Sequence, residues 1–164
     1  MEIRALRRGE GARLRELRLR ALRDAPQAFF WSLETEERTT AQDWEAWADD
    51  SAHDRIMFVA VEDGEWLGVA GCSLRGDEAG TLDATGMWVA PHARGRNLGE
   101  RLIEVVMEWG RARGARTMEF AVTETNDAAI ALYRRVGFAP TGRRRTLESN
   151  PHLVGMFMAK SLHP

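Results

Sequence analysis

Tyr133 is the only tyrosine of the chain, and the segment around it has the pattern of an amphipathic helix. Asn126 before the segment is a suitable N-cap, and Gly137 after it suits a left-handed C-terminal residue. A phenol with an ordinary pKa of about 10 stays protonated at neutral pH, so Tyr133 can donate a proton to a departing group. The alternative is a half-buried aromatic side chain whose hydroxyl binds some neighbour. The apolar residues at the i, i+3, i+4 and i+7 spacing are Ala129, Leu132, Tyr133 and Val136.

A glycine-containing turn after Val89, at the end of an expected strand, is a second candidate site for chemistry. A turn with glycines at 95 and 99 opens a helix there, and Pro91 ends the strand. The free backbone N–H groups of a helix start carry a partial charge of about +0.5, which suits a phosphate. Arg94 and Arg96 add forked donors that match phosphate oxygens. The glycine spacing fits neither a Walker loop nor a dinucleotide-binding loop.

Composition limits the protein class. The chain has 164 residues, 44% hydrophobic and 29% charged, which is typical of one globular domain. Its net charge of −2 argues against a dedicated nucleic-acid surface. The start of the chain lacks an apolar leader, and no stretch approaches the length of a membrane span. We therefore expect a cytoplasmic protein that contacts neither membrane nor nucleic acid.

Two residue types that occur once give further limits. Cys72 is the only cysteine, so neither an intramolecular disulfide nor a cysteine zinc cluster can form, and we expect no metal. We expect Cys72 to be a small core residue rather than an acyl-carrying nucleophile. Lys160 is the only lysine, and this strong preference for arginine suggests a GC-rich bacterial genome.

The order of elements predicts a mixed α/β fold. Early strands joined by hairpins, such as the turn at Asp63-Gly64 and a turn near 77–80, give way to strands that alternate with helices. This order implies one mixed sheet covered on both faces. The expected helices cover 10–23, 36–50, a segment from 98 to a close at Gly114, and the segment between Asn126 and Gly137. The expected strands cover 2–8, 55–62, 66–73, 82–89, 118–122, 138–145 and 153–159.

Several of these segments resemble the GCN5-related N-acetyltransferases (GNAT). Residues 94–99 are similar to the family's acetyl-CoA loop, Gln/Arg-x-x-Gly-x-Gly/Ala, at both ends. Residues 87–91 resemble the strand and proline before that loop, and 126–138 resemble the family's second CoA segment. Residues 24–29, followed by 32–34, are similar to the loop between the first two helices. The resemblance covers almost the whole chain in the right order.

The resemblance implies a GNAT fold, in which a mostly antiparallel mixed sheet of about six or seven strands is flanked by about four helices. It implies one N-acetyltransferase domain over residues 1–164, small and bacterial in type, and a homodimer. The implied reaction moves an acetyl group from acetyl-CoA to a primary amine by direct attack in a ternary complex. The acceptor would be a small cationic amine or a peptide or protein amine. The alternative function is a non-catalytic module that binds and senses acyl-CoA.

Site residues follow from the same resemblance. Backbone groups of the strand at 87–89 would pair with the pantetheine arm, and amides of the loop would hold the pyrophosphate. Asn126 would contact pantetheine or fix its helix, and Tyr133 would place its hydroxyl near the thioester sulfur. Asn97 stands where the family has its central glycine, and asparagine tolerates the left-handed conformation better than most residues. The expected cofactor contacts are Met87, Trp88, Val89, Arg94, Gly95, Arg96, Asn97, Leu98, Gly99 and Asn126.

An amine with a pKa near 10 must lose a proton before it attacks, so a general base is needed. Asp83 is the preferred candidate because some family members place a carboxylate on this strand. Strict alternation would put Asp83, Met87 and Val89 on one face unless a bulge intervenes. A role as a turn or strand-edge residue is equally compatible with Asp83. Glu34, Glu124 or a chain of waters could serve instead.

The acceptor pocket is less well defined. Trp31, Phe30 and Trp88 are candidate pocket walls, although core positions fit them equally well. Residues 34–50 hold seven carboxylates against one arginine, and we interpret them first as the wet face of a helix. Some of them, Glu34 included, could line a mouth that attracts a cationic acceptor. The predicted substrate contacts are therefore Trp31 and Glu34.

Overall fold

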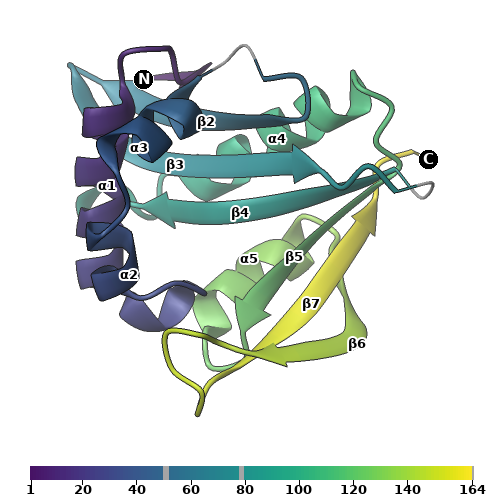
Figure 1. The fold of residues 1–164 in the computed structure, drawn as a ribbon. Coiled ribbons are helices and arrows are strands. Elements are labelled where there is room, and N and C mark those ends of the chain that lie inside the picture. Colours follow the sequence, from purple (N-terminus) through teal and green to yellow (C-terminus); the bar gives the residue numbers. More distant parts are fainter. Residues whose placement is uncertain (50–51, 78–79, 164) are drawn as a thin grey trace.

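A computed structural model describes residues 1–49, 52–77 and 80–163, which contain one sheet with helices on both faces (Figure 1). Within this part of the chain the sheet has seven strands in the order β1-β2-β3-β4-β5-β7-β6. Among the described strands only β4 and β5 are parallel, and the other neighbours are antiparallel. The strands are β1 (Glu2–Ala5), β2 (Arg55–Glu62), β3 (Glu65–Leu74), β4 (Thr81–Val89), β5 (Thr117–Thr123), β6 (Ala139–Thr146) and β7 (Val154–Ser161).

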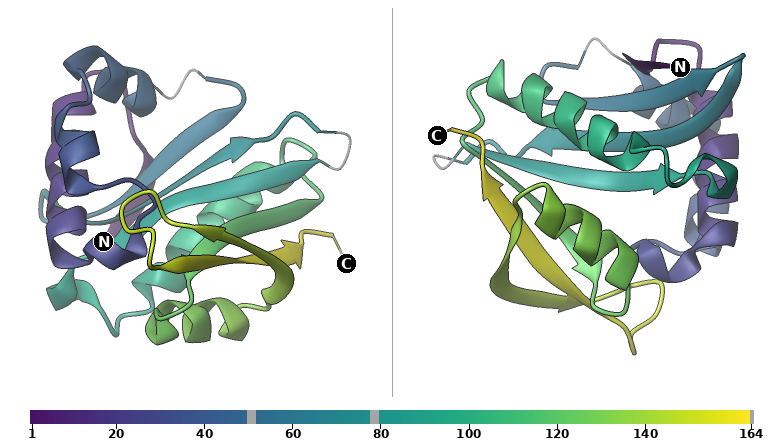
Figure 2. Two further views of the ribbon diagram at one scale, coloured as in Figure 1. Left: turned by 60° about the horizontal axis from the view of Figure 1, so that its bottom comes forward. Right: turned by 180° about the vertical axis from the view of Figure 1, so that it is seen from behind.

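The helices fall into two groups. The helices α1 (Gly11–Asp24), α2 (Leu33–Glu37) and α3 (Ala41–Ala48) lie together on one side of the sheet, and α4 (Leu98–Arg111) and α5 (Asp127–Arg135) cover the other (Figure 2). The predicted mixed fold and nearly all predicted elements are confirmed. No helix in the described residues is both long and apolar enough to cross a membrane.

The predicted helix over 36–50 is wrong. The chain forms two shorter helices there, because Ser32 and Thr40 each start a new helix. The Ser32 hydroxyl accepts from the Thr35 amide at 3.1 Å, and the Thr40 hydroxyl accepts from the Asp43 amide at 3.1 Å. The end of that prediction, at Asp50, and part of the predicted turn near 77–80 lie outside the described residues.

The apolar face of α4 forms much of the core behind the sheet. Leu98, Leu102 and Val106 are almost completely buried, as the helical spacing of the sequence predicts. Gly110 lets this helix approach β4, since an added Cβ would lie 2.5 Å from Leu82 Cδ2. This close packing holds the end of α4 against the start of β4.

The strands β4 and β5 pair over only three residues each. Thr81–Asp83 pair with Thr117–Glu119, and beyond them the two strands diverge (Figure 1). Each of the two strands therefore has an unpaired backbone edge that faces the gap. The gap lies in the middle of the sheet, between its only parallel pair among the described strands.

A bulge in β4 lies beside the gap. The register with β3 shifts between Val69 and Gly71, so that Gly86 and Met87 together oppose one residue of β3. Gly86 has φ +63°, a left-handed conformation that favours glycine. Trp88 consequently shares a face with Asp83, whereas Met87 points to the α5 side. The bulge that the sequence analysis left open therefore occurs. Because of it, Met87 does not share a face with Asp83, as strict alternation would have required.

A buried ion pair supports the bulge from the α1 side. Arg18 Nε donates to Glu36 Oε2 at 3.2 Å, and its Nη2 bonds the other carboxylate oxygen. The two side chains are only 10% and 4% exposed. Arg18 Nη1 also donates to the Gly86 carbonyl at 3.4 Å. The pair therefore ties α1 and α2 to the bulge, and removal of either partner would leave a buried charge uncompensated.

We predict that Gly86→Ala lowers the free energy of unfolding by about 3 kcal/mol, roughly twice the loss from Gly64→Ala. Both glycines have positive φ, but an added Cβ at Gly86 would lie 2.7 Å from Arg18 Nη1, whereas none lies within 4 Å at Gly64. Urea denaturation of the two variants separates backbone strain from displacement of the ion pair. Equal losses would show that the Arg18 contact contributes nothing.

Candidate active site

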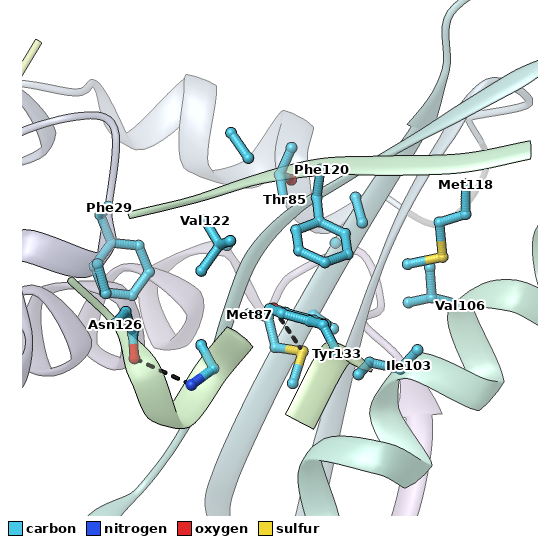
Figure 3. A pocket seen from close by; sticks show the side chains of 17 residues that line it. Phe29, Thr85, Met87, Ile103, Val106, Met118, Phe120, Val122, Asn126 and Tyr133 are labelled. Carbon is cyan, nitrogen blue, oxygen red and sulfur yellow. Dashed lines mark hydrogen bonds between the residues drawn. The ribbon is translucent and has the colours of Figure 1, made fainter. Parts of the chain in front are cut away.

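The gap between β4 and β5 contains a cavity of about 640 Å³, its open mouth included (Figure 3). Both diverging strands line it, together with α4, α5 and the segment before α2. Most of the lining is apolar, with few polar groups. Its labelled side chains in Figure 3 are Phe29, Thr85, Met87, Ile103, Val106, Met118, Phe120, Val122, Asn126 and Tyr133.

Tyr133 projects into this cavity from α5 (Figure 3). Its ring packs against Phe120 with 3.8 Å between centroids, and its hydroxyl donates to Met87 Sδ at 3.6 Å. Thioether sulfur is a weak acceptor, so the proton is held loosely. The surrounding apolar groups disfavour the phenolate and raise the pKa of Tyr133. At neutral pH the cavity therefore contains a protonated donor that no nitrogen or oxygen of the described residues engages through a hydrogen bond.

Asn126 caps the helix that carries Tyr133. Its side-chain oxygen accepts from the Ala129 amide at 3.2 Å, so it satisfies one of the free amides of α5 (Figure 3). It also lines the cavity. Of the two roles expected for Asn126, the structure shows the one that fixes the helix.

The strand end at Met87, Trp88 and Val89 borders the gap, but the three side chains point to different surroundings. Met87 contacts the Tyr133 hydroxyl, whereas the Trp88 indole is buried and donates to Asp24 Oδ2 at 2.8 Å. Trp88 thus lies in the core beside α1 and does not line the cavity. The free backbone edge of these residues matches an extended partner that pairs like an added strand.

The loop at the start of α4 presents its amides without a side-chain cap. Gly95 has φ +76°, and Asn97 occupies the left-handed region with φ 58° and ψ 18°. The Asn97 side chain makes no capping hydrogen bond to the helix. Asparagine therefore adopts the turn that the family's glycine would form, and the first amides of α4 are open to an anion.

The arginines of the loop are held by carboxylates. Arg94 pairs with Asp24 and donates from Nε to the Val89 carbonyl at 3.0 Å. Arg96 contacts both oxygens of Glu62 at 2.7 and 2.9 Å, and this hydrogen bonding raises the pKa of Arg96. Anion binding here would thus depend first on backbone amides, with the arginines fixing the shape of the loop.

Gly99 is required by packing. A Cβ at this position would lie 2.9 Å from Leu132 Cδ2 and 3.2 Å from Met87 Cε. The glycine therefore allows α4 to begin close to α5 and the cavity wall. This contact joins the loop, the bulged strand and the helix of Tyr133 in one place.

A sequence profile of the Acetyltransferase (GNAT) family matches residues 14–138, which include both strands of the gap, the loop and Tyr133. The chain belongs to the GNAT acetyltransferase family. The resemblance stated from the sequence is thereby confirmed.

Relatives with known names match parts of this GNAT chain. Aminoglycoside N(6')-acetyltransferase type 1 of Salmonella typhimurium is 30% identical over 52% of this chain and 63% of its own length. Streptothricin acetyltransferase of Streptomyces lavendulae is 37% identical over 61% of this chain and 53% of its own length. An L-methionine sulfoximine/L-methionine sulfone acetyltransferase of Pseudomonas aeruginosa is 34% identical over 60% of this chain and 60% of its own length. The matched segments thus span no more than 63% of these three relatives.

Solved structures of the family share the whole fold. A GCN5-related N-acetyltransferase from Kribbella flavida has a TM-score of 0.78 at 25% identity and covers 98% of this chain and 96% of its own. The protein yncA of Salmonella typhimurium was solved with its cofactor acetyl-CoA. Its structure has a TM-score of 0.79 at 21% identity and covers 100% of this chain and 95% of its own. The predicted GNAT fold is confirmed.

Asp83, the predicted base, does not line the cavity. It lies where β4 still pairs with β5, opposite Glu119. Arg75 Nε donates to Asp83 Oδ2 at 3.0 Å, and this pairing raises the pKa of Arg75. The structure therefore places Asp83 in a salt-bridge cluster near the gap rather than beside Tyr133.

The predicted acceptor contacts are also apart from the cavity. Trp31 is 49% exposed and packs edge-on against Phe30, with 4.9 Å between ring centroids. Glu34 is exposed and pairs with Arg38 at 2.5 Å. The remaining candidate base, Glu124, pairs with Arg144 at 2.6 Å.

No local sequence pattern gives a chemical role to Phe29, Thr85, Asp24 or Arg145. Phe29 and Thr85 line the cavity, and only the tertiary fold brings them to it. Cys72 is a buried core residue, as predicted, and burial raises the pKa of its thiol to about 12. The described residues contain no group of three or more His, Cys, Asp or Glu side chains that could hold a metal ion.

Asp24 connects the core to the loop because it accepts from Trp88 and pairs with Arg94. These contacts lower the pKa of Asp24, with the Trp88 bond contributing most. A carboxyl group with a lowered pKa in the folded state stabilises the fold above its unfolded pKa of about 3.9, and this stability is lost as pH falls through the folded value.

We predict that wild type is more stable than Asp24→Asn near neutral pH and that the difference shrinks as pH falls below about 4. Asparagine can still accept from Trp88 but cannot pair with Arg94 as an anion. Denaturation of both proteins across this pH range measures the effect, because all other carboxyl groups titrate in both. A difference that stays constant with pH would contradict the assignment.

Proposed function

We propose that the chain is a single N-acetyltransferase domain over residues 1–164 that transfers the acetyl group of acetyl-CoA to a primary amine. The observation that supports this proposal most strongly is the Tyr133 hydroxyl, which points into a cavity at the unpaired edge of β4. A protonated phenol at this place is suited to neutralise a thiolate. Membership of the GNAT family agrees with this reaction.

The described residues fit acetyl-CoA as a substrate. The free edge of β4 offers backbone groups to the pantetheine arm, and the apolar cavity accommodates an acetyl group. The uncapped start of α4 offers amides to the pyrophosphate. Residues 87–89, 94–99 and Asn126 thus remain the proposed cofactor contacts.

In the proposed reaction the free amine attacks the acetyl carbon directly. The new C–N bond forms as the C–S bond breaks, and the nitrogen loses a proton while the sulfur gains one. Tyr133 supplies the proton to the sulfur and regains one from solvent. Burial makes the Tyr133 phenol a weaker acid than a thiol, whose ordinary pKa is about 8.5, so Tyr133 acts first by donating a hydrogen bond to the developing thiolate.

We propose Asp83 as the base, acting through water. It shares a sheet face with Thr85 of the cavity wall, and Arg75 keeps its carboxylate in place. A substrate that enters from the face opposite α5 would lie between the Asp83 carboxylate and the Tyr133 hydroxyl. The two residues then act at the two ends of the reacting group.

The acceptor is proposed to be a small amine. The named relatives include acetyltransferases of aminoglycosides, streptothricin and methionine sulfoximine, all of which carry amino groups. A peptide or protein amine stays open as a wider class. The homodimer and the cytoplasmic location remain predictions from the sequence.

A sensing module that binds acyl-CoA without turnover is the alternative. Binding alone would be served equally well by phenylalanine at position 133, which packs the same ring against Phe120. The hydroxyl contributes only a weak bond to Met87 sulfur, so its retention favours catalysis.

We predict that Tyr133→Phe lowers kcat by roughly a hundredfold while the Kd for acetyl-CoA changes little, because only the proton donor is lost. Thiol release during acetylation measures kcat, and titration calorimetry measures binding. Thermal unfolding of the variant controls for folding. An unchanged kcat would remove Tyr133 from the mechanism and favour the sensing alternative.

A further inference from the structure

A second, smaller and open cavity of about 220 Å³, the solvent at its mouth included, adjoins the acetyl cavity. The two share Ala28, Ala121 and Val122 in their linings, so they lie next to each other along β5. The smaller cavity contains the side chains of Phe30 and Arg145, which no proposed step uses. A group bound there would extend from an amine that enters the acetyl cavity.

Arg145 is held in place by aromatic rings. Its guanidinium carbon lies 4.1 Å from the Phe30 ring centroid and 5.4 Å from that of Phe157. Contact with ring faces orients the planar guanidinium and leaves its N–H edge free for an acceptor. This geometry resembles a prepared anion contact more than a mobile surface side chain.

The charge of Arg145 is not compensated within the described residues. No carboxylate among them lies within the 4.0 Å of an ion pair with its guanidinium, whereas neighbouring Arg143 pairs with Glu119 and Arg75 pairs with Asp83. Burial lowers the pKa of Arg145, Asp83 opposes this from a distance, and Arg143 lowers the pKa further. Arg145 lies on the exposed strand β6, so an anion arriving from solvent could reach its guanidinium and find it without a carboxylate partner among the described residues.

None of the described carboxylates of residues 34–50 lines either cavity. These carboxylates are already engaged by arginines, amides or a hydroxyl, and Asp50 lies outside the described residues. The cationic-acceptor interpretation thus loses the free carboxylates on which it depended. The contacts are Glu34–Arg38, Glu36–Arg18, Glu37–Arg23, Asp43–Thr40, Glu45–Gly11 and Asp49–Arg8.

We propose that Arg145 binds a carboxylate of the acceptor, so that the preferred substrate is an amino acid or a similar small amine bearing an acid group. This inference rests on the proposed N-acetyltransferase function. The guanidinium edge pairs with both carboxylate oxygens, and Phe30 covers the adjoining carbon chain. The amino group then extends past Ala121 toward the acetyl cavity.

Matched acceptors test the inference without any variant. Each L-amino acid, for example methionine or phenylalanine, is compared with its own carboxamide, which keeps the side chain and the amine but lacks the negative charge. The kcat/KM values are expressed per unprotonated amine, because the amide has the lower amine pKa. We expect the acid to exceed the carboxamide by about tenfold or more.

Variants of two neighbouring arginines locate the effect. Arg145→Gln should lower kcat/KM for the amino acid about tenfold, mainly through KM, and should change the value for the carboxamide less than about twofold. Arg144→Gln is the matched control, because Arg144 lies on the same strand but pairs with Glu124. It should leave the preference for the acid unchanged.

The outcomes separate the two proposals. Acetylation of carboxamides or polyamines in preference to amino acids would overturn the inference and leave the N-acetyltransferase function standing. Equal losses on both members of a pair in Arg145→Gln would also overturn it. Binding of acetyl-CoA without acetylation of any amine would overturn the proposed function, and the inference with it.

Discussion

The early divergence of β4 from β5 is the constraint on which the rest of the structure depends. Continued pairing of the two strands would close the sheet and remove the cavity, the free backbone edge and the place to which Tyr133 points. Unpaired strand edges are costly unless something covers or uses them. An extended cofactor arm that pairs with this edge would satisfy it, which explains why a fold of this kind suits acyl-CoA.

Four local features surround the gap between the two strands. The bulge at Gly86 turns the end of β4, and the buried pair of Arg18 with Glu36 holds α1 and α2 against it. The Asp24 carboxylate accepts from the Trp88 indole, just after the bulge, and pairs with Arg94 of the loop. On the other side Gly99 allows α4 and α5 to meet behind the gap. Small local features thus position groups from distant parts of the sequence around one cavity.

The sequence predicts the local elements well, because hydrophobic periodicity, turn residues and helix caps are local signals. It also predicts the positions of Tyr133, Asn126 and the loop, since each lies at a recognisable helix boundary. The single helix over 36–50 is wrong because the N-cap chemistry of Thr40 outweighs helical periodicity. Ion-pair partners cannot be derived from periodicity, so the pairing of Asp83 with Arg75 and the isolation of Arg145 become apparent only in the fold.

We expect acetyl-CoA to bind in the gap, along β4 and at the start of α4. Amide hydrogen exchange with and without acetyl-CoA tests this expectation most directly, because the amides at 84–89 on the unpaired edge and those at 95–100 of the loop and helix start should become protected together. The rest of the sheet, including β1 and β2, should change little. Protection elsewhere, with these two segments unaffected, would show that acetyl-CoA does not bind in the gap.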